Sequence, residues 1–316
     1  MKFLDALNGC NRSSPPIWLM RQAGRYLPEY QVFRAKHSLR ELFFTPHLAK
    51  EVTLQPIRRF GFDAAILFSD IAAIAPAMGF ALEFKEGPSV TPSATEQNWR
   101  SLKQNLDLLD PIAEAAFLTK QALDVPLIGF CGGPFTIATY LIGTTEWEKT
   151  WKREEFAAFL DSIATMCIAS LQRQIEAGVD AVQIFDSWAN LLNEEDFQEF
   201  SLKPLQKIIK AVHKPTILFM RGSAKRAELL VPVNPSAISV DWERPISEIR
   251  RAVKTPLQGN LNPDLLFAPF EQIQQEVKSL LDEMKNDPAF ILNLGHGVKP
   301  GTPLEAVAAL IQIARS

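Results

Sequence analysis

Short apolar runs that end in polar or glycine-containing tips recur along the whole chain. Parallel strands that are buried on both faces have continuous runs of Val, Ile, Leu and Phe rather than an alternating pattern. Eight runs are predicted as strands: 17–20 (IWLM), 64–68 (AAILF), 126–130 (PLIGF), 181–185 (AVQIF), 216–220 (TILFM), 237–240 (AISV), 256–261 (PLQGNL) and 290–294 (FILNL). Their regular recurrence favours a parallel sheet.

Amphipathic segments separate these runs, and several have recognisable ends. The clearest one precedes the second run, where Thr45 is the predicted N-cap, Pro46 begins a helix that runs to Phe60, and Gly61 stops it. The segment 154–177 has the same design and is followed by Gly178. Its predicted buried stripe is Phe156, Leu160, Ile163, Cys167, Leu171 and Ile175. Two further starts of the capping-box kind are Asn193 with Asp196, and Thr302 with Pro303 and Glu305.

Strands that alternate with helices predict an α/β fold, and we expect a single (β/α)8 TIM barrel domain over residues 1–316. No linker rich in Pro, Gly or Ser divides the chain, and a barrel of this kind needs only about 250 residues. The longest connection, from about 76 to 98, is expected to be a loop. No GxGxxG or GxxxxGK follows a predicted strand, so the sequence supports neither a dinucleotide site nor a P-loop.

Composition narrows the class of protein further. Hydrophobic residues make up 47%, charged residues 22%, and the net charge is −3, which argues against a nucleic-acid binder or a polybasic membrane protein. Cys10, Cys131 and Cys167 are far apart and form no CxxC, so neither a disulfide framework nor a zinc knuckle is indicated. The first residues are too polar for a secretory leader, and no apolar window approaches a membrane span. We therefore expect a soluble cytoplasmic protein.

The chemistry of such barrels lies at the carboxyl ends of the strands, where side chains from different strands converge. The residues at the predicted tips are Arg21, Gln22 and Arg25; Ser69 and Asp70; Cys131, Gly132 and Gly133; Asp186 and Ser187; Arg221 and Ser223; Asp241; Gln258 and Asn260; and His296. An acid, several arginines and one histidine would then face a common space.

Asp70 has two interpretations. An unpaired carboxylate after an apolar run is costly, so it is either locked to an arginine or open to a cationic or donor-rich ligand, and its strand-end position favours the ligand. Arg21 and Arg25 are either ligand-binding residues or members of surface ion pairs. Ala23 and Gly24 between them let the backbone approach a ligand, which favours binding.

Three other residues keep a structural alternative. His296 lies between two glycines but is also compatible with a hydrogen-bonded structural role. Tyr140 would pack a helix, and Ser187 would bond the backbone at a turn. Residues interpreted as a structural ion-pair layer are Asp186, Asp241 and Arg221. If some of the 21 Phe line the barrel mouth, they would suit a flat apolar ring system.

The strand tips also lie in motifs that resemble one family. The motif MRQAGRYLPEY (20–30) is similar to a specific signature of the uroporphyrinogen decarboxylases, and the resemblance extends over nearly the whole chain. The other motifs are LFSDI (67–71), AMG (77–79), GFCGGPFTIATY (129–140), FDSWA (185–189), VDW (240–242), LQGNL (257–261), NLGHG (293–297) and TP (302–303). Positions that the resemblance implies as substrate-contacting are Arg21, Gln22, Ala23, Gly24, Arg25, Asp70, Tyr140, Ser187 and His296. Among these it implies Asp70, Arg21 and Arg25 as catalytic.

The resemblance implies decarboxylation of the four acetate side chains of uroporphyrinogen III to methyls, which gives coproporphyrinogen III in haem biosynthesis. It implies no cofactor, no metal and a homodimer. Most decarboxylases take their electron sink from pyridoxal phosphate, thiamine or a metal. A pyrrole protonated on a ring carbon is itself such a sink. Asp70 would then stabilise the charged ring, while Arg21 and Arg25 hold carboxylates.

Departures from the family pattern leave alternatives open. The pattern usually has Arg at Gln31 and commonly Lys at Arg221, and a shorter segment stands at 142–151. That segment leaves open a non-catalytic tetrapyrrole binder. A second alternative is a zinc-dependent corrinoid or thiol methyltransferase of the same barrel superfamily. A chain that resembles such enzymes has a His-x-Cys motif after a middle strand. Residues 219–222, at the corresponding strand tip, contain neither His nor Cys.

Overall fold

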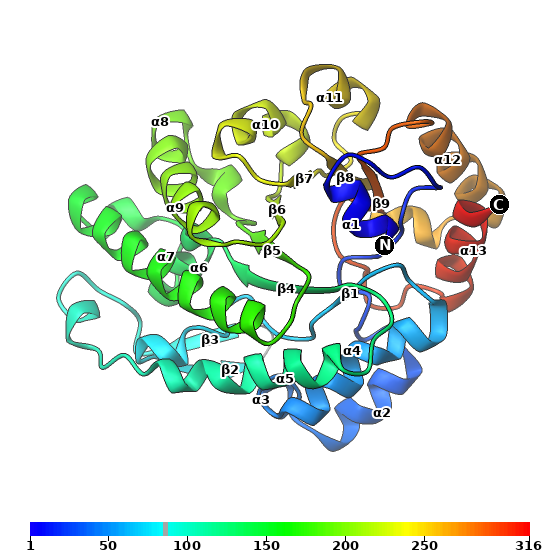
Figure 1. The fold of residues 1–316 in the computed structure, drawn as a ribbon. Coiled ribbons are helices and arrows are strands. Elements are labelled where there is room, and N and C mark those ends of the chain that lie inside the picture. Colours follow the sequence, from blue (N-terminus) through cyan, green and yellow to red (C-terminus); the bar gives the residue numbers. More distant parts are fainter. Residues whose placement is uncertain (85–87) are drawn as a thin grey trace.

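A curled parallel sheet forms the centre of the molecule in the computed structural model, which describes residues 1–84 and 88–316 (Figure 1). Among these residues, the strands in spatial order are β1 (Ala65–Ile66), β4 (Leu127–Gly132), β5 (Ala181–Phe185), β6 (Thr216–Phe219), β7 (Ala237–Ser239), β8 (Leu257–Leu261) and β9 (Phe290–Leu294). Every neighbouring pair is parallel. The last seven of the eight predicted runs are therefore confirmed as strands.

The eighth position of the barrel is filled by an extended segment, residues 16–20, which we call the closing segment. Ile17 forms an isolated parallel bridge with Leu292 of β9. On its other side, the Ile17 carbonyl accepts a hydrogen bond from the Asp63 N–H at 2.8 Å, just before β1. The closing segment thus joins both edges of the sheet, and the fold is the expected α/β TIM barrel. The predicted first strand lacks a regular ladder because β1 beside it is only two residues long.

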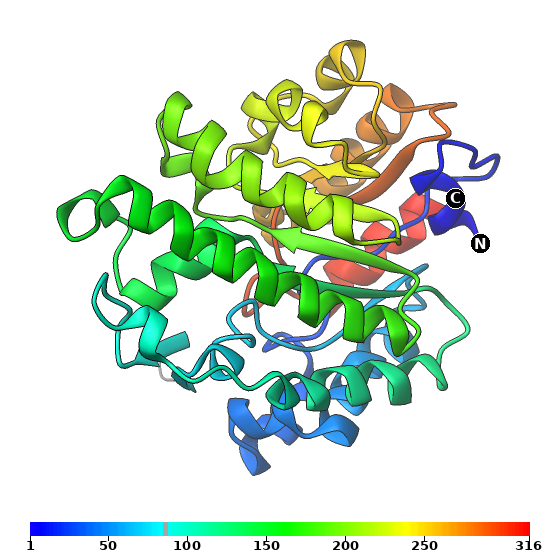
Figure 2. The same cartoon turned by 60° about the vertical axis from the view of Figure 1, so that its left-hand side comes forward.

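Helices surround the sheet on its outside, and Figure 2 shows α5 and α7 running side by side along that surface. The α-helices are α1 (Lys2–Leu7), α2 (Pro28–Lys36), α3 (Leu39–Phe44), α4 (Pro46–Phe60), α5 (Asp110–Lys120), α6 (Pro134–Ile142), α7 (Arg153–Glu176), α8 (Glu194–Asp196), α9 (Lys203–Ala211), α10 (Ser223–Leu230), α11 (Ile246–Ala252), α12 (Phe270–Glu283) and α13 (Leu304–Arg315). Short 3-10 turns are η1 (Pro76–Met78), η2 (Trp99–Ser101), η3 (Leu106–Leu109), η4 (Trp147–Lys149), η5 (Ala189–Leu191), η7 (Val231–Val233) and η8 (Pro263–Phe267). The turn η6 (Phe197–Leu202) is π-helical.

The predicted helix ends are mostly confirmed. Helix α4 spans Pro46–Phe60, and Gly61 ends it in the left-handed conformation with φ of 64°. Helix α7 ends just before Gly178, whose φ of 103° suits glycine alone. The Asn193 side chain accepts from the Asp196 N–H, as the capping pattern predicts.

The prediction that Thr302 caps the last helix is wrong. The N-cap of α13 is Pro303, which has no side-chain acceptor. The Thr302 hydroxyl donates instead to the Lys299 carbonyl at 2.8 Å, so it closes the turn that precedes the helix. Local bonding within that turn competes with capping, as is common for threonine.

The prediction of a loop over residues 76–98 is also wrong. The segment contains η1 and a two-stranded antiparallel sheet made of β2 (Ala81–Phe84) and β3 (Pro88–Thr91). Only Leu82 of β2 is buried, so neither strand has the continuous apolar run that marks the barrel strands. Residues 85–87 of this connection lie outside the described residues.

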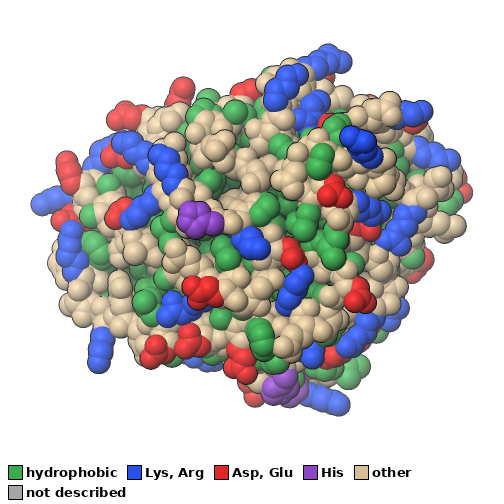
Figure 3. All heavy atoms as spheres, viewed as in Figure 1, with side chains coloured by type: hydrophobic (Ala, Val, Ile, Leu, Met, Phe, Trp, Pro, Cys, Tyr) green, Lys and Arg blue, Asp and Glu red, His purple; other side chains and the backbone are tan. Residues whose placement is uncertain are grey.

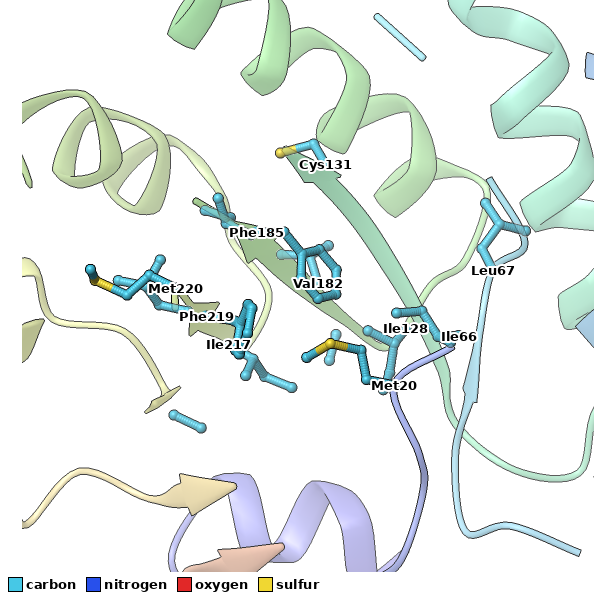
Figure 4. Packing of buried hydrophobic residues seen from close by; sticks show 14 of the residues in the cluster. Met20, Ile66, Leu67, Ile128, Cys131, Val182, Phe185, Ile217, Phe219 and Met220 are labelled. Atoms are coloured by element: carbon cyan, nitrogen blue, oxygen red, sulfur yellow. The ribbon is translucent and has the colours of Figure 1, made fainter. Parts of the chain in front are cut away.

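The inside of the barrel is packed with apolar side chains and crossed by one polar layer. Figure 4 shows Met20, Ile66 and Ile217 among the packed residues, and a fully buried side chain of this size contributes about 1.5 to 3 kcal/mol. The Gln258 amide of β8 donates to Gln183 Oε1 of β5 at 3.3 Å, across the barrel. These contacts tie opposite walls together, which gives the barrel mouth a rigid floor.

Candidate active site

Arg21 follows the closing segment directly and has an unusual backbone. Its φ is 61°, a left-handed conformation that costs a non-glycine residue about 1 to 3 kcal/mol and is maintained only by its surroundings. Its side chain crosses the backbone of Gly297, where an added Cβ would meet Arg21 Cδ at 2.4 Å. The glycine after His296 is therefore required by the arginine that lies over it. The left-handed backbone and the fixed side-chain path make Arg21 a candidate functional residue.

Asp70 lies beyond the end of β1 and has little local support. Its Oδ1 accepts one hydrogen bond, from the Ala72 N–H at 2.8 Å, and it forms no ion pair within residues 1–84 and 88–316. Burial raises the pKa of Asp70 to about 6, while the Ala72 N–H and the positive charge of Arg21 work in the opposite direction. As a whole residue, Asp70 is half-buried. Of its two interpretations, a locked ion pair is excluded for the described residues, and an open carboxylate remains.

Arg21 is the centre of a cluster of charged and polar groups. Its side chain is exposed, yet protein atoms surround it closely enough that burial is the main cause lowering its pKa. Asp70 and Tyr140 raise that pKa, whereas Arg221 and Arg25 lower it. These groups come from different places around the barrel, namely beyond β1, on α6, beyond β6 and beyond the closing segment. The structure therefore brings five of the strand-end and helix residues together.

His296 is half-buried beside this cluster. Burial, followed by the positive charges of Arg21, Arg221 and Lys299, lowers the pKa of His296 to about 4. Its Nδ1 accepts a hydrogen bond from the Gly297 N–H at 2.8 Å, so in the neutral ring the proton is assigned to Nε2. At neutral pH the ring is thus an uncharged donor, not a cation.

Aromatic rings form a row that ends at the barrel mouth. The ring centroids of Phe130 and Phe185 are 5.5 Å apart, those of Phe185 and Phe219 are 5.9 Å apart, and those of Phe219 and His296 are 5.7 Å apart. These rings come from β4, β5, β6 and the loop after β9. Phe130 is partly exposed, whereas Phe185 and Phe219 are 7% and 1% exposed, so these two rings pack in the barrel core and the row ends at His296 beside the charged groups.

Gln22 does not reach the mouth. Its side chain is fully buried, its Oε1 accepts from the Leu19 N–H at 3.3 Å, and its Nε2 donates to the Ala64 carbonyl at 3.3 Å. Both ends of the amide are occupied inside the protein, so a side-chain contact with a ligand is not supported. Gln22 instead fastens the closing segment to the residue before β1.

The rest of the turn after the closing segment is accessible. Arg25 is exposed, and Ala23 and Gly24 are half-buried. The Arg25 carbonyl accepts from Gln31 Nε2 at 2.8 Å, so the residue that replaces the usual family arginine stabilises this turn. Ser187, beyond β5, is half-buried.

The predicted ion-pair layer at the strand ends is wrong in its chemistry. Asp186 is fully buried and accepts from the Thr136 N–H at 2.9 Å, the Thr136 hydroxyl at 2.8 Å and the Ser201 hydroxyl at 2.6 Å. Asp241 accepts from the Ala224 N–H at 3.2 Å. These acids are satisfied by backbone and hydroxyl donors near helix starts rather than by arginines, and their role is structural.

Arg221 lies at a predicted strand tip, but its interpretation as a member of a structural ion-pair layer is wrong. Its guanidinium lies over the Trp188 ring, 4.4 Å from the ring centroid, and no acidic partner pairs with it in the described parts of the chain. The tips of the neighbouring strands β5 and β6 carry the two residues. That adjacency was the available signal, because both tips appear in the predicted strand order.

Elsewhere in residues 1–84 and 88–316, the surface offers no comparable convergence of charged and polar side chains. Hollows of about 690 and 530 Å³ lie between α5 and α7 and beside α11 and α12, among mixed polar and apolar side chains. Within the described residues, no group of three or more His, Cys, Asp or Glu is placed to hold a metal. None of the described helices is long and apolar enough to cross a membrane. Figure 3 shows positive and negative side chains interspersed on one face, without a field of one sign.

Sequence relatives share one name. The family described as uroporphyrinogen decarboxylase (URO-D) matches residues 1–316. A uroporphyrinogen decarboxylase from Protochlamydia amoebophila is 45% identical, over 99% of this chain and 91% of the relative. One from a Chelativorans species is 43% identical, over 99% of this chain and 98% of the relative.

Solved structures share the fold. A methyltransferase from Methanosarcina mazei superposes with a TM-score of 0.83 at 24% identity, covering 99% of this chain and 97% of the other. A B12-independent methionine synthase from a Shewanella species, in complex with selenomethionine, gives 0.62 at 13% identity, covering 96% and 95%. At identities this low, the structural similarity supports a shared barrel fold but not a shared activity. The family match over the whole length, together with close relatives of nearly equal extent, shows that this chain belongs to the uroporphyrinogen decarboxylase family.

Proposed function

We propose that this protein is a carboxy-lyase that converts uroporphyrinogen III to coproporphyrinogen III by removing its four acetate carboxyl groups, without a cofactor. The observation that carries the proposal is the Asp70 carboxylate beside Arg21 at the mouth of the barrel, which accepts only one hydrogen bond within the described residues. Family membership supports it.

Asp70 is suited to the pyrrole N–H groups of the macrocycle. With a pKa of about 6, the carboxylate is mostly ionised at neutral pH, and its second oxygen is open to donors. Protonation of a ring carbon beside an acetate makes the pyrrole cationic. The bond to the carboxyl carbon then breaks, its electron pair enters the ring, and carbon dioxide leaves. Protonation of the resulting exocyclic methylene gives the methyl, and the ring carbon loses the proton it had taken up, which restores the pyrrole. An anion fixed beside the ring stabilises the charge that develops, which lowers the barrier.

The arginines are proposed to hold the acidic side chains of the substrate. Arg21 and Arg25 form charge-assisted hydrogen bonds with carboxylates, each contributing about 1.5 to 3 kcal/mol. The positive charge of Arg21 also favours the ionised form of Asp70. Tyr140, Ser187 and the His296 Nε2–H supply neutral polar contacts, and the backbone at Ala23 and Gly24 completes the rim.

Structural observations bear on both alternative functions. The segment 142–151, which left a non-catalytic binder open, is packed: Trp147 stacks on Phe156 with centroids 4.6 Å apart, and Trp151 stacks on Phe159 at 4.9 Å. Trp147 and Trp151 are buried while most of the segment is exposed, so these two rings anchor the segment against α7. The zinc methyltransferase alternative lacks ligands at residues 219–222.

We further propose that residues 1–316 act as one domain, as a homodimer, in the cytoplasm. A homodimer would give a mass near twice 35.3 kDa by light scattering. A monomeric mass at working concentrations would remove the dimer from the proposal and leave the chemistry unaffected.

The test of the function is an anaerobic assay with uroporphyrinogen III and purified, metal-free protein. The expected result is carbon dioxide release and coproporphyrinogen formation with no added cofactor. Binding without any release of carbon dioxide would select the carrier alternative, and activity that depends on stoichiometric zinc would select the methyltransferase-like chemistry.

A further inference from the structure

The function proposed above makes no use of Arg221. We propose that Arg221 is a specificity-determining residue that binds a substrate carboxylate at the edge of the macrocycle opposite to the edge held by Arg21 and Arg25, and that Trp188 positions it. This inference rests on the proposed function, because it places a polycarboxylate ring in the barrel mouth.

Arg221 and Arg21 approach the mouth from opposite sides. In the spatial order of the barrel, β6 lies four positions from the closing segment in either direction, through β1, β4 and β5 or through β9, β8 and β7. Arg21 follows the closing segment, and Arg221 follows β6. Both nonetheless lower the pKa of His296, so their charges extend over a shared centre. A ring lying over that centre would have a cation at each of two opposite edges.

The guanidinium of Arg221 is free to bind an anion. Its side chain is exposed. Its Cζ lies 4.4 Å from the Trp188 ring centroid, and within the described residues no hydrogen bond or ion pair occupies its side-chain N–H groups, so the N–H groups at its edge are left for a planar acceptor. A carboxylate accepts from that edge through two parallel hydrogen bonds.

Another stacked arginine shows what a structural arrangement of this kind looks like. Arg100 lies over Trp99, 4.3 Å from the ring centroid, and also forms an ion pair with Glu155. The stacking distances of the two arginines are nearly equal, but only Arg100 has an internal carboxylate. Arg221 stacks in the same way but has no carboxylate partner within the described residues. A carboxylate of the substrate would take the place that Glu155 takes beside Arg100.

Trp188 is fixed before any ligand arrives. Its backbone N–H donates to the Thr136 hydroxyl at 2.9 Å, and that hydroxyl donates to the buried Asp186 at 2.8 Å. The backbone that carries the stacking ring is therefore tied to the start of α6 by one hydrogen bond, and its acceptor is held in turn by Asp186. A cation held on a fixed surface loses less freedom on binding, which favours affinity.

The test compares anaerobic initial rates with uroporphyrinogen III for Arg221→Gln, Arg221→Lys and, as a matched control, Arg100→Gln. The expected result for Arg221→Gln is a KM raised roughly 10- to 100-fold with kcat changed less than about threefold, because a binding contact is lost. Arg221→Lys keeps the positive charge but lacks the planar edge of N–H donors, so its KM should lie between those of the wild type and Arg221→Gln. Arg100→Gln should match the wild type. A KM for Arg221→Gln within about twofold of wild type overturns the inference.

Trp188 is tested by a double-mutant cycle. Trp188→Leu should raise KM in the wild-type background and add nothing in the Arg221→Gln background, since it acts through the arginine. Equal effects in both backgrounds would show that Trp188 does not position Arg221.

Binding is measured separately from turnover. Anaerobic equilibrium dialysis against uroporphyrinogen, with Asp70→Asn in every sample, should show the same loss of affinity for Arg221→Gln. If the wild type released no carbon dioxide, the proposed function would fail, and dialysis alone would decide the role of Arg221. Equal affinities with and without Arg221 would then refute this inference separately.

Discussion

Two acids follow strands of the same barrel, Asp186 fully buried and Asp70 half-buried, and they differ in how completely they are hydrogen-bonded. Asp186, beyond β5, accepts three hydrogen bonds from Thr136 and Ser201. Asp70, beyond β1, accepts one, from Ala72. Burial raises the pKa of both acids. The difference teaches that strand-end position alone does not leave an acid open to a ligand: the acid must also keep unused acceptor capacity.

The local sequence explains the contrast. After β4, Gly133 leads into α6, where the Thr136 N–H and hydroxyl face Asp186. An added Cβ at Gly133 would meet Asp186 Cβ at 2.3 Å, so the glycine permits this close approach. Asp70 has only the short turn that follows it, whose one N–H donor comes from Ala72. Asp186 is enclosed, whereas Asp70 is left open.

The largest expected effect separates the two acids by activity. Asp70→Asn should lower kcat at least about 100- to 1000-fold, because the fixed anion that stabilises ring charge is lost. Asp186→Asn, in protein that is still folded, should keep kcat within a few-fold. Steady-state rates under anaerobic conditions measure both. A larger kcat loss in folded Asp186→Asn than in Asp70→Asn would reverse the assignment.

The second effect separates them by stability. Asp186→Asn places an amide donor against the Thr136 and Ser201 donors, so the free energy of unfolding should fall by about 2 to 4 kcal/mol. Ser201→Ala, which removes a single donor, serves as the control and should cost about 1 to 2 kcal/mol. Urea unfolding followed by circular dichroism measures the difference. A neutral Asp186→Asn would contradict the structural role.

The third effect is a gain in stability: Asp70→Asn should raise the free energy of unfolding, whereas Asp186→Asn should lower it. The folded-state pKa of Asp70, about 6, lies above its ordinary 3.8, so charging this acid destabilises the native state. The penalty is absent below pH 4 and complete above pH 6. Asp70→Asn should therefore be more stable than wild type by about 1 to 3 kcal/mol at pH 8 and no more stable at pH 3.5. Unfolding at the two pH values tests this, and equal gains at both would disprove the electrostatic origin.

The smallest effect sharpens the comparison through pH. If turnover needs ionised Asp70, kcat/KM should rise with an apparent pKa near 6 and be about tenfold lower at pH 5 than at pH 7. Arg21→Ala should move this midpoint upward, because the charge of Arg21 lowers the pKa of Asp70. His296, with a pKa of about 4, should add no limb in this range. A flat profile between pH 5 and 7 would argue against Asp70.

Much of the barrel followed from the sequence because its strands are buried on both faces. The runs at 181–185 and 290–294 coincide with β5 and β9 to the residue, since continuous apolar runs have few alternative structures. The β2 and β3 pair was missed because only one side of such a hairpin is buried. Thr302 was misjudged because a threonine hydroxyl has several nearby backbone acceptors, and sequence does not rank them.

The site was predicted less completely than the fold. Strand ends located Asp70 and Arg21, but not the direction in which each side chain points. Two residues show the resulting errors. Gln22 was predicted to contact a ligand but bonds inside the core, and Arg221 was predicted to form a structural ion pair but stacks on Trp188. Side-chain direction depends on tertiary contacts such as the stack on Trp188, which no local pattern contains.

Closure of the barrel by residues 16–20 has a consequence for how the protein is made. Ile17 bridges Leu292, the Met20 carbonyl accepts from the Val298 N–H at 2.8 Å, and both marked termini lie on the same side of the molecule (Figures 1 and 2). During synthesis, residues 16–20 are made early but can close the barrel only after β9 and Gly297 have been added. A chain cut before β9 would leave Ile17 without its bridge partner and Arg21 without the glycine over which its side chain lies.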